Sequence, residues 1–283
     1  MKELPFTENS MYFAKYGSGE DIFVGLHGWS GDHRTFFPLI KYLPENVTFY
    51  SADLPGNGNS PAPNEWTIAQ LVQEIATGIE LLPNAPMTIL GSCSGGLLGL
   101  FVAKYLLEKG QTKNLKRLVL IDPFAYFPWY FKVFIAPQMG KIGWYAYYTT
   151  FANPLGRLMT NLSLRQHRTE GTHLTNTFSK VNHEVTYRYL QLLSEGGSAE
   201  QFSVVTVPVT IVHGEKTFGA IRESLRRWQK ILPSLSSHEL AGTGHLPIVE
   251  NPAGLAEILF KNDQLRTKSY EQALTKLHHP VSP

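Results

Sequence analysis

The chain of 283 residues has almost no cysteine: Cys93 is the only one. A single cysteine excludes an intramolecular disulfide, and it excludes the paired cysteine ligands of a structural zinc site. The first ten residues also lack the basic stretch followed by an apolar stretch that a secretory signal peptide needs. We therefore expect a protein of the reducing cytoplasm that works without a metal or another cofactor.

The chain also lacks a large excess of positive or negative residues and has no long apolar run. The 25 Lys and Arg residues nearly balance the 23 Asp and Glu residues, and no basic run suggests a phosphate-binding surface. Nucleic acid is therefore not an expected partner. The most apolar stretch, residues 124–136, contains Lys132 and is shorter than the run of about 18 apolar residues that a transmembrane helix needs. With 43% hydrophobic residues, the composition is that of a globular protein with one substantial core.

The first 122 residues alternate between short apolar runs and helical patterns, which is typical of βαβ units and a parallel sheet. Residues 11–16 are expected to form an earlier, antiparallel edge strand. The other expected strands cover residues 22–26, 47–51, 87–90 and 118–121. The expected helices cover residues 33–43, 67–82 and 94–108.

This alternation stops between residues 123 and 203, where aromatic residues are dense and a polar helical stretch follows at 176–193. It resumes with expected strands at 209–212 and 238–240 and expected helices at 219–232 and 252–260. We therefore predict an α/β fold, with a mostly parallel sheet flanked by helices and a helical cap insertion. The predicted parts are a first core segment (1–122), a cap (123–203) and a second core segment (204–283), whose polar tail is either a surface helix or disordered.

Residues 87–96 place an apolar strand, a residue flanked by glycines and a helix in immediate succession. This order predicts a nucleophile elbow, whose central residue lies on a strained turn and needs small residues two positions before and after it. Gly91 and Gly95 satisfy this requirement only when Cys93 is the centre. The partial positive charge at the start of the next helix favours a thiolate there. The alternative is that Cys93 is simply a small buried hydrophobic residue.

A general base is expected after the last strand, because the chain order in this arrangement is nucleophile, acid, histidine. Residues 241–245 read Ala-Gly-Thr-Gly-His, and the two glycines allow a loop that lays the His245 imidazole over the carboxyl edge of the sheet. We therefore predict His245 as the base.

Together these motifs resemble the α/β-hydrolase fold superfamily, in a variant with the cysteine-centred motif G-x-C-x-G. The resemblance covers residues 11–122 and 204–262. His27, Gly28 and Trp29 directly follow the first buried strand and resemble the oxyanion-hole loop of that family. The resemblance implies that the backbone N–H groups of Trp29 and Ser94 hold the oxyanion.

The acid of the expected triad is the weakest part of the pattern. Family members usually carry an aspartate where this chain has Thr217, and a hydroxyl cannot balance the charge of an imidazolium. Asp122 is the favoured replacement, because relatives such as haloalkane dehalogenases place their acid after the corresponding strand. Glu215 is an alternative acid with a longer reach. A third alternative is a Cys–His dyad without an acid, since a thiol depends less than a serine on a fully supported base.

The cysteine also narrows the expected substrate. Its acyl intermediate is a thioester. Transfer of an acyl group from an ordinary ester to the cysteine raises the free energy, whereas transfer from coenzyme A or an acyl-carrier protein changes it little. We therefore predict a thioesterase or acyltransferase for a hydrophobic acyl group. The alternatives are a carboxylesterase or lactonase that uses the same residues, and a hydrolase-like binding protein that has lost catalysis. The expected substrate-binding residues, whose aromatic members are equally suited to packing within the cap, are His27, Phe124, Trp129 and Trp144.

Overall fold

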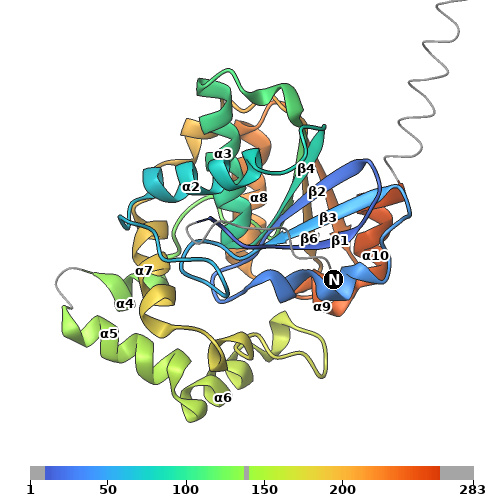
Figure 1. Ribbon diagram of the computed structural model, residues 1–283. Helices are drawn as coiled ribbons and strands as arrows, with labels where there is room; N and C mark the ends of the chain where they lie inside the picture. The colour runs from blue at the N-terminus through green and yellow to red at the C-terminus, as the bar shows by residue number, and fades with distance from the viewer. Residues whose placement is uncertain (1–9, 137–139, 262–283) are drawn as a thin grey trace, which may run out of the picture.

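The computed structural model describes residues 10–136 and 140–261 (Figure 1). Its centre is a seven-stranded sheet with the order β1-β3-β2-β4-β5-β6-β7. β1 (Phe13–Gly17) lies at one edge and pairs antiparallel with β3 (Val47–Ala52), and the remaining neighbours pair in parallel. The predicted fold class, an α/β fold with a mostly parallel sheet, is confirmed, and so is the antiparallel edge strand.

The central strands are buried on both faces, which explains their nearly continuous apolar sequences. All of them extend one to three residues beyond the sequence-based ranges. The largest differences, three residues each, are at the starts of β5 and β7; β7 begins at Leu235 rather than at residue 238, because Ser236 and Ser237 give this edge strand a polar start. The remaining strands are β2 (Asp21–Leu26), β4 (Met87–Ser92), β5 (Leu115–Ile121), β6 (Val209–Gly214) and β7 (Leu235–Leu240).

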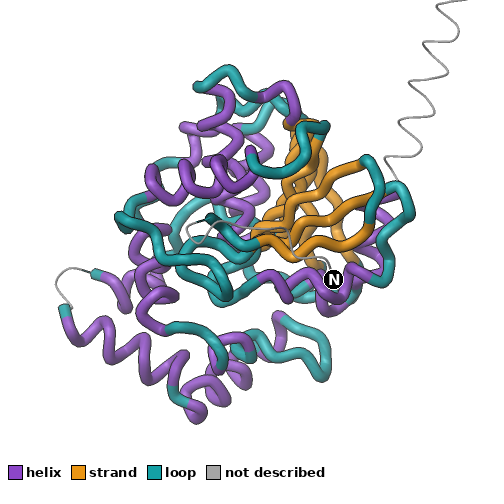
Figure 2. The backbone as a smooth tube through the Cα atoms, viewed as in Figure 1, coloured by secondary structure: helices purple, strands orange, loops and turns teal. Residues whose placement is uncertain are grey.

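Helices cover both faces of the sheet (Figures 1 and 2). One face packs against α2 (Ile68–Glu80), α3 (Ser94–Glu108) and α8 (Gly219–Ile231), with a core that includes Leu98 and the fully buried Trp228. The other face has its own core, which includes Leu39 and Leu255. Its short helices are α1 (Phe37–Ile40), α9 (Pro247–Glu250) and α10 (Pro252–Ala256), the last continued by a π-helical turn (Glu257–Lys261).

Two expected helices are interrupted in the structure. The helix expected at 33–43 is a 3-10 turn (His33–Phe36) followed by the single turn of α1, which buries only Leu39. The helix expected at 176–193 is a 3-10 turn (Thr177–Ser179) followed by α7 (His183–Ser194). The break occurs because the side chain of Asn182 accepts hydrogen bonds from the N–H groups of Glu184 and Val185 and so starts a new helix.

The segment between β5 and β6 is helical and forms a layer beyond the carboxyl end of the sheet (Figure 1). Its main elements are α4 (Lys132–Ile135), α5 (Lys141–Tyr147), a π-helical segment (Tyr148–Ala152), α6 (Pro154–Ser163) and α7. Other 3-10 turns lie at Thr112–Asn114, Trp129–Phe131, Arg165–His167 and Ala199–Phe202. The division into core and cap at residues 123 and 203 stays a prediction.

The polar tail from residue 262 onward lies outside the described residues. Within the described residues, no helix combines the length and the apolar character that crossing a membrane requires.

Candidate active site

Cys93 lies on a sharp turn between β4 and α3, with φ 52° and ψ −115°, a conformation that residues other than glycine rarely adopt. The turn brings strand and helix so close that neighbouring side chains do not fit. A Cβ on Gly91 would lie 2.5 Å from the carbonyl oxygen of Gly95, and a Cβ on Gly95 would lie 2.2 Å from the carbonyl oxygen of Leu26. The geometry therefore explains why glycines flank this position on both sides.

His245 follows β7 in a short loop, and its Nδ1 lies 2.8 Å from Oδ2 of Asp122. Asp122 directly follows β5, is 1% exposed and has a positive φ of 48°. The loop of His245 is held from the other side by its backbone N–H, which donates to the carbonyl oxygen of His167 at 2.9 Å. The structure thus brings together the histidine and the favoured acid of the sequence analysis, which are 123 residues apart.

The imidazole of His245 is buried, and burial alone lowers the pKa of a histidine. The hydrogen bond to Asp122 and the nearby Cys93 outweigh burial and raise the pKa of His245 to about 10. The protonated imidazole is therefore the stable form at neutral pH, between a carboxylate on one side and the sulfur on the other. Phe218 and Phe124 flank the ring, with ring centroids 4.6 Å and 6.2 Å from that of His245.

Thr217, which breaks the family pattern in the sequence, is part of the same network. It is fully buried, and its hydroxyl donates to Oδ2 of Asp122 at 2.5 Å. The backbone N–H of Gly214 donates to Oδ1 of Asp122 at 3.3 Å. Thr217 thus supports the carboxyl group on the neighbouring strand. Sequence reasoning missed this role, although the pairing of adjacent parallel strands β5 and β6 was a possible signal.

Glu215, the alternative acid, is engaged elsewhere. Its Oε2 accepts a hydrogen bond from the backbone N–H of Gly242 at 2.6 Å, which shapes the loop that precedes His245. Its side chain is exposed. Glu215 is therefore a loop-supporting residue in this geometry, and the hydrogen bond to the imidazole comes from Asp122.

The loop after β2 lies directly beside Cys93. A Cβ on Gly28 would lie 3.3 Å from the Cβ of Cys93. In the described part of the chain, the backbone N–H groups of Trp29 and Ser94 donate to no backbone carbonyl, so both are free to bind an oxyanion. The hydroxyl of Ser94 is also buried there and has no hydrogen-bond partner among the described residues.

The side chain of Trp29 connects this loop to the helical layer. Its Nε1–H donates to the carbonyl oxygen of Thr186 in α7 at 2.7 Å. Its indole ring packs against aromatic rings with centroids 5.0 to 6.1 Å away, those of Phe131, Tyr147, Phe151 and Phe178. The residue that carries the expected oxyanion donor is therefore fixed by the helical layer above the sheet.

His27 differs from its expected role in substrate binding. It is 1% exposed, its Nδ1 donates to the carbonyl oxygen of Gly28 at 2.8 Å, and its Nε2 accepts from the N–H of Leu54 at 3.0 Å. Burial lowers the pKa of His27, which matches this neutral pattern of one donor and one acceptor. Both ring nitrogens are used, so we expect His27 to hold the loop rather than to contact substrate.

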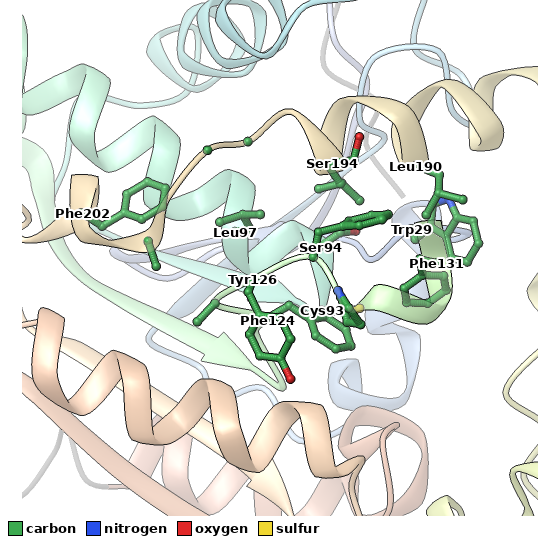
Figure 3. Close-up of a pocket in the computed structure, with 17 residues that line it drawn as sticks. Trp29, Cys93, Ser94, Leu97, Phe124, Tyr126, Phe131, Leu190, Ser194 and Phe202 are labelled. Carbon is green, nitrogen blue, oxygen red and sulfur yellow. The ribbon is translucent and has the colours of Figure 1, made fainter. Parts of the chain in front are cut away.

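Two cavities meet at Cys93. The larger has a volume of about 1080 Å³ and reaches from His245 to α6, and the smaller, with about 80 Å³, extends toward Leu97 and Phe202 (Figure 3). The small cavity is predominantly apolar, and the unpartnered hydroxyl of Ser94 lies in its wall. The residues that border both cavities are Trp29, Cys93, Phe124 and Phe131.

The aromatic residues expected to bind substrate fall into two groups. Phe124 borders both cavities. Trp129 is 80% exposed and Trp144 stacks on Tyr147 with ring centroids 5.5 Å apart, and neither borders either cavity. For Trp144 the alternative of packing within the helical layer describes the structure better, because its ring contacts Tyr147 of the same helix and Tyr187 of α7.

One group of potential metal ligands lies in the described residues, formed by Asp32, His33 and Asp53, whose ligand atoms lie within 4.8 Å of one another. Asp53 is fully buried and accepts hydrogen bonds from the N–H and Nδ1 of His33 and from the N–H of Asn59. Asp32 forms an ion pair with Arg34. The hydrogen bonds account for this cluster, which stabilises the turns after β2 and β3.

Comparisons with known proteins show which family the chain is similar to. A model of the alpha/beta hydrolase family matches residues 23–258. The pimeloyl-[acyl-carrier protein] methyl ester esterase of Neisseria meningitidis serogroup B is 32% identical over 121 residues, which are 41% of this chain and 43% of that protein. Lipase LipV of Mycobacterium tuberculosis is 28% identical over 114 residues, which are 40% of this chain and 41% of that protein. The chain thus matches less than half the length of these curated relatives.

Solved structures show the same fold at low sequence identity. A lipase-esterase related protein from Clostridium acetobutylicum has a TM-score of 0.68 at 18% identity, covering 89% of this chain and 98% of that one. The epoxide hydrolase CorEH has a TM-score of 0.63 at 18% identity, covering 89% of this chain and 93% of that one. At this level of identity the likeness extends to the fold alone.

Proposed function

Because the chain belongs to the alpha/beta hydrolase family, we propose that it transfers an acyl group to an acceptor through a covalent intermediate on Cys93. The observation that carries the proposal is the grouping of three side chains: Asp122 Oδ2 lies 2.8 Å from Nδ1 of His245, and His245 and Cys93 border the same large cavity, where Cys93 helps to raise the pKa of the imidazole. An acid, a base and a nucleophile in this order can activate a thiol and then deliver its proton to a leaving group.

In the proposed reaction, the sulfur of Cys93 attacks the acyl carbonyl. The developing oxyanion accepts hydrogen bonds from the backbone N–H groups of Trp29 and Ser94. The protonated His245 gives its proton to the leaving group as the tetrahedral intermediate collapses to an acyl-Cys93 thioester. Water or another acceptor then loses a proton to His245, attacks the thioester and releases the acyl product, while Asp122 keeps the imidazole oriented.

The proposed substrate is a hydrophobic acyl group on a thiol carrier, either coenzyme A or an acyl-carrier protein. Exchange between two thioesters loads Cys93 at little cost in free energy. The two cavities support a substrate made of an acyl chain and a carrier, because the small cavity of about 80 Å³ suits an acyl chain and the large one suits a long carrier arm. A cavity of about 150 Å³ holds benzene, so the small cavity has room for roughly three or four carbon atoms.

A second candidate function is that of a carboxylesterase, favoured by the relatives that carry the names methyl ester esterase and lipase. In this case the acyl part occupies the large cavity and a small alcohol occupies the small one. Catalysis would use the same side chains, so the two candidates differ in substrate and not in machinery.

The first experiment compares a butyryl thioester with the matched butyryl oxygen ester. We expect a butyryl adduct on Cys93 by mass spectrometry, faster turnover of the thioester, and no adduct in Cys93→Ala. Absence of adduct and turnover over all acyl lengths tested would support the hydrolase-like binding protein and contradict both candidates.

Two matched leucine variants separate the candidates. Leu97 borders only the small cavity and Leu164 borders only the large one. If the small cavity binds the acyl chain, Leu97→Ala extends the tolerated acyl length by roughly two carbons, because it frees about that much volume, and Leu164→Ala does not. An extended tolerance for the alcohol instead of the acyl chain would favour the carboxylesterase.

A further inference from the structure

The outer side of the helical layer exposes an unusual amount of apolar surface. On α6, four large apolar side chains recur at positions i, i+3, i+4 and i+7 and therefore share one face of the helix. All four are more than half exposed: Leu155 (66%), Leu158 (54%), Met159 (59%) and Leu162 (52%). The other side of the helix is engaged with the protein, since Asn161 is buried against Thr175 and Arg157 donates to the carbonyl oxygen of Ala152.

Neighbouring segments of the helical layer also expose large aromatic and aliphatic side chains. Ile142 and Tyr145 on α5 are each 63% exposed, Tyr148 is 48% exposed and Trp129 is 80% exposed. In Figure 1, α5 and α6 form the outermost part of the molecule on the side away from the sheet. We call this surface the outer face; its members are Trp129, Ile142, Tyr145, Tyr148, Leu155, Leu158, Met159 and Leu162.

The segment that carries the outer face has charge of one sign. From residue 123 to residue 169 the sequence contains no Asp or Glu. Lys132, Lys141 and Arg165 lie in this stretch with exposed side chains. A monomeric soluble protein rarely exposes a large apolar surface, and the segment that carries this one contains positive charges and no carboxylate.

We propose that the outer face docks on an anionic lipid surface. Helices that lie in the plane of a membrane combine exposed Leu, Trp and Tyr side chains with Lys and Arg, and anionic headgroups attract the cations. Exposed Trp and Tyr side chains suit the boundary between headgroups and acyl chains, where one end of the ring is apolar and the other is hydrated.

The site and the outer face share a helix. Thr160 of α6 and Leu164, which directly follows α6, border the large cavity, while the leucines of the outer face lie on the other side of the same helix. Docking would therefore hold the cavity of Cys93 close to the lipid surface, where lipophilic acyl compounds concentrate. The docking itself does not depend on the reaction at Cys93, so its test requires no turnover.

The test is sedimentation of the full chain with vesicles of phosphatidylcholine alone and of phosphatidylcholine mixed with phosphatidylglycerol. We expect binding to the mixed vesicles, weakened by salt. The variant Leu155→Gln/Leu158→Gln/Leu162→Gln should bind at least about tenfold more weakly, because three apolar anchors no longer enter the interface. The matched control is Leu81→Gln/Val204→Gln, which alters side chains that are 62% and 52% exposed outside the outer face and should bind as the unaltered chain does.

Circular dichroism and hydrolysis of a short soluble substrate accompany the binding data, and both should be unchanged in the leucine variant, whose altered residues border neither cavity. Two outcomes would overturn the proposal. One is that neither vesicle type binds the chain or that the leucine variant binds equally well. The other is a dimer in analytical ultracentrifugation that the leucine variant dissociates while vesicles remain unbound, which would assign the outer face to a second copy of the chain.

Discussion

Thr217 stands where family members usually carry an aspartate, and Asp122, after the neighbouring strand, supplies the carboxylate instead. The hydroxyl of Thr217 donates to the same carboxylate oxygen that lies 2.8 Å from Nδ1 of His245. A carboxylate oxygen can accept more than one hydrogen bond, so the second donor does not compete with the imidazole. With threonine at position 217, the carboxylate beside the imidazole is that of Asp122, which follows the neighbouring strand, and the Thr217 hydroxyl keeps a polar link between the two segments.

Replacing Thr217 by valine tests this link. Thr217→Val keeps the shape of a fully buried side chain but removes the donor to Asp122, and we expect the free energy of unfolding to fall by about 2 kcal/mol. The matched change Thr48→Val removes a hydrogen bond from a buried threonine to the neutral carbonyl oxygen of Gly19 and should cost about 1 kcal/mol. Chemical denaturation measures both values, and equal losses would argue against a charged acceptor.

At the scale of elements, the junction of β4 and α3 depends on the absence of side chains. The helix starts so close to the loop after β2 that a Cβ on Gly95 would meet the carbonyl oxygens of Leu26 and His27 at 2.2 Å and 2.4 Å. One turn further along no such approach exists, because a Cβ on Gly99 would be 3.4 Å from its nearest neighbour, a methyl group of Ile89.

Two alanine substitutions in this helix should therefore have opposite effects. Gly95→Ala should lower the free energy of unfolding by about 3 kcal/mol, because the backbone must move to admit the methyl group. Gly99→Ala should raise it by up to about 1 kcal/mol, because alanine favours the helix and the space is sufficient. Thermal or chemical unfolding of the two variants checks this, and a stable Gly95→Ala variant would contradict the close approach.

For the whole molecule, the hydrogen bond between Asp122 and His245 joins the end of β5 to the loop after β7. It therefore links a residue that precedes the helical layer in the sequence to one that follows it. Folding raises the pKa of His245 from its ordinary value of 6.5 to about 10. A group with a raised pKa contributes its full stability below its unfolded pKa, and the contribution is lost as the pH rises toward the folded value. The protein should therefore lose stability between pH 6.5 and about 10.

Comparison with His245→Gln isolates this contribution. The difference in free energy of unfolding between the unaltered chain and the variant should shrink progressively as the pH rises through this window. Tyrosines and lysines titrate in both proteins, so their effects cancel in the difference. Denaturant unfolding at a series of pH values measures it, and a difference that is independent of pH would show that the imidazole carries no stabilised proton.

Local patterns in the sequence were sufficient for the sheet, for the helix that begins at Ser94 and for the frame of the turn around Cys93. The reason is that alternating apolar runs and the steric need for Gly91 and Gly95 act between residues close in the chain. Element ends were less predictable, as with the cap by Asn182 that divides one expected helix, because a single side-chain hydrogen bond decides such a boundary.

Only the tertiary structure decided which acid meets the imidazole, because Asp122, Glu215 and His245 come together through the pairing of strands far apart in the sequence. The same holds for the aromatic residues between β5 and β6. Phe124 borders the cavities and Trp129 is exposed, although both belong to one apolar run. Composition and local spacing determine that such side chains need a hydrophobic partner, whereas the packing of distant helices determines whether that partner is the core, a substrate or a surface outside the molecule.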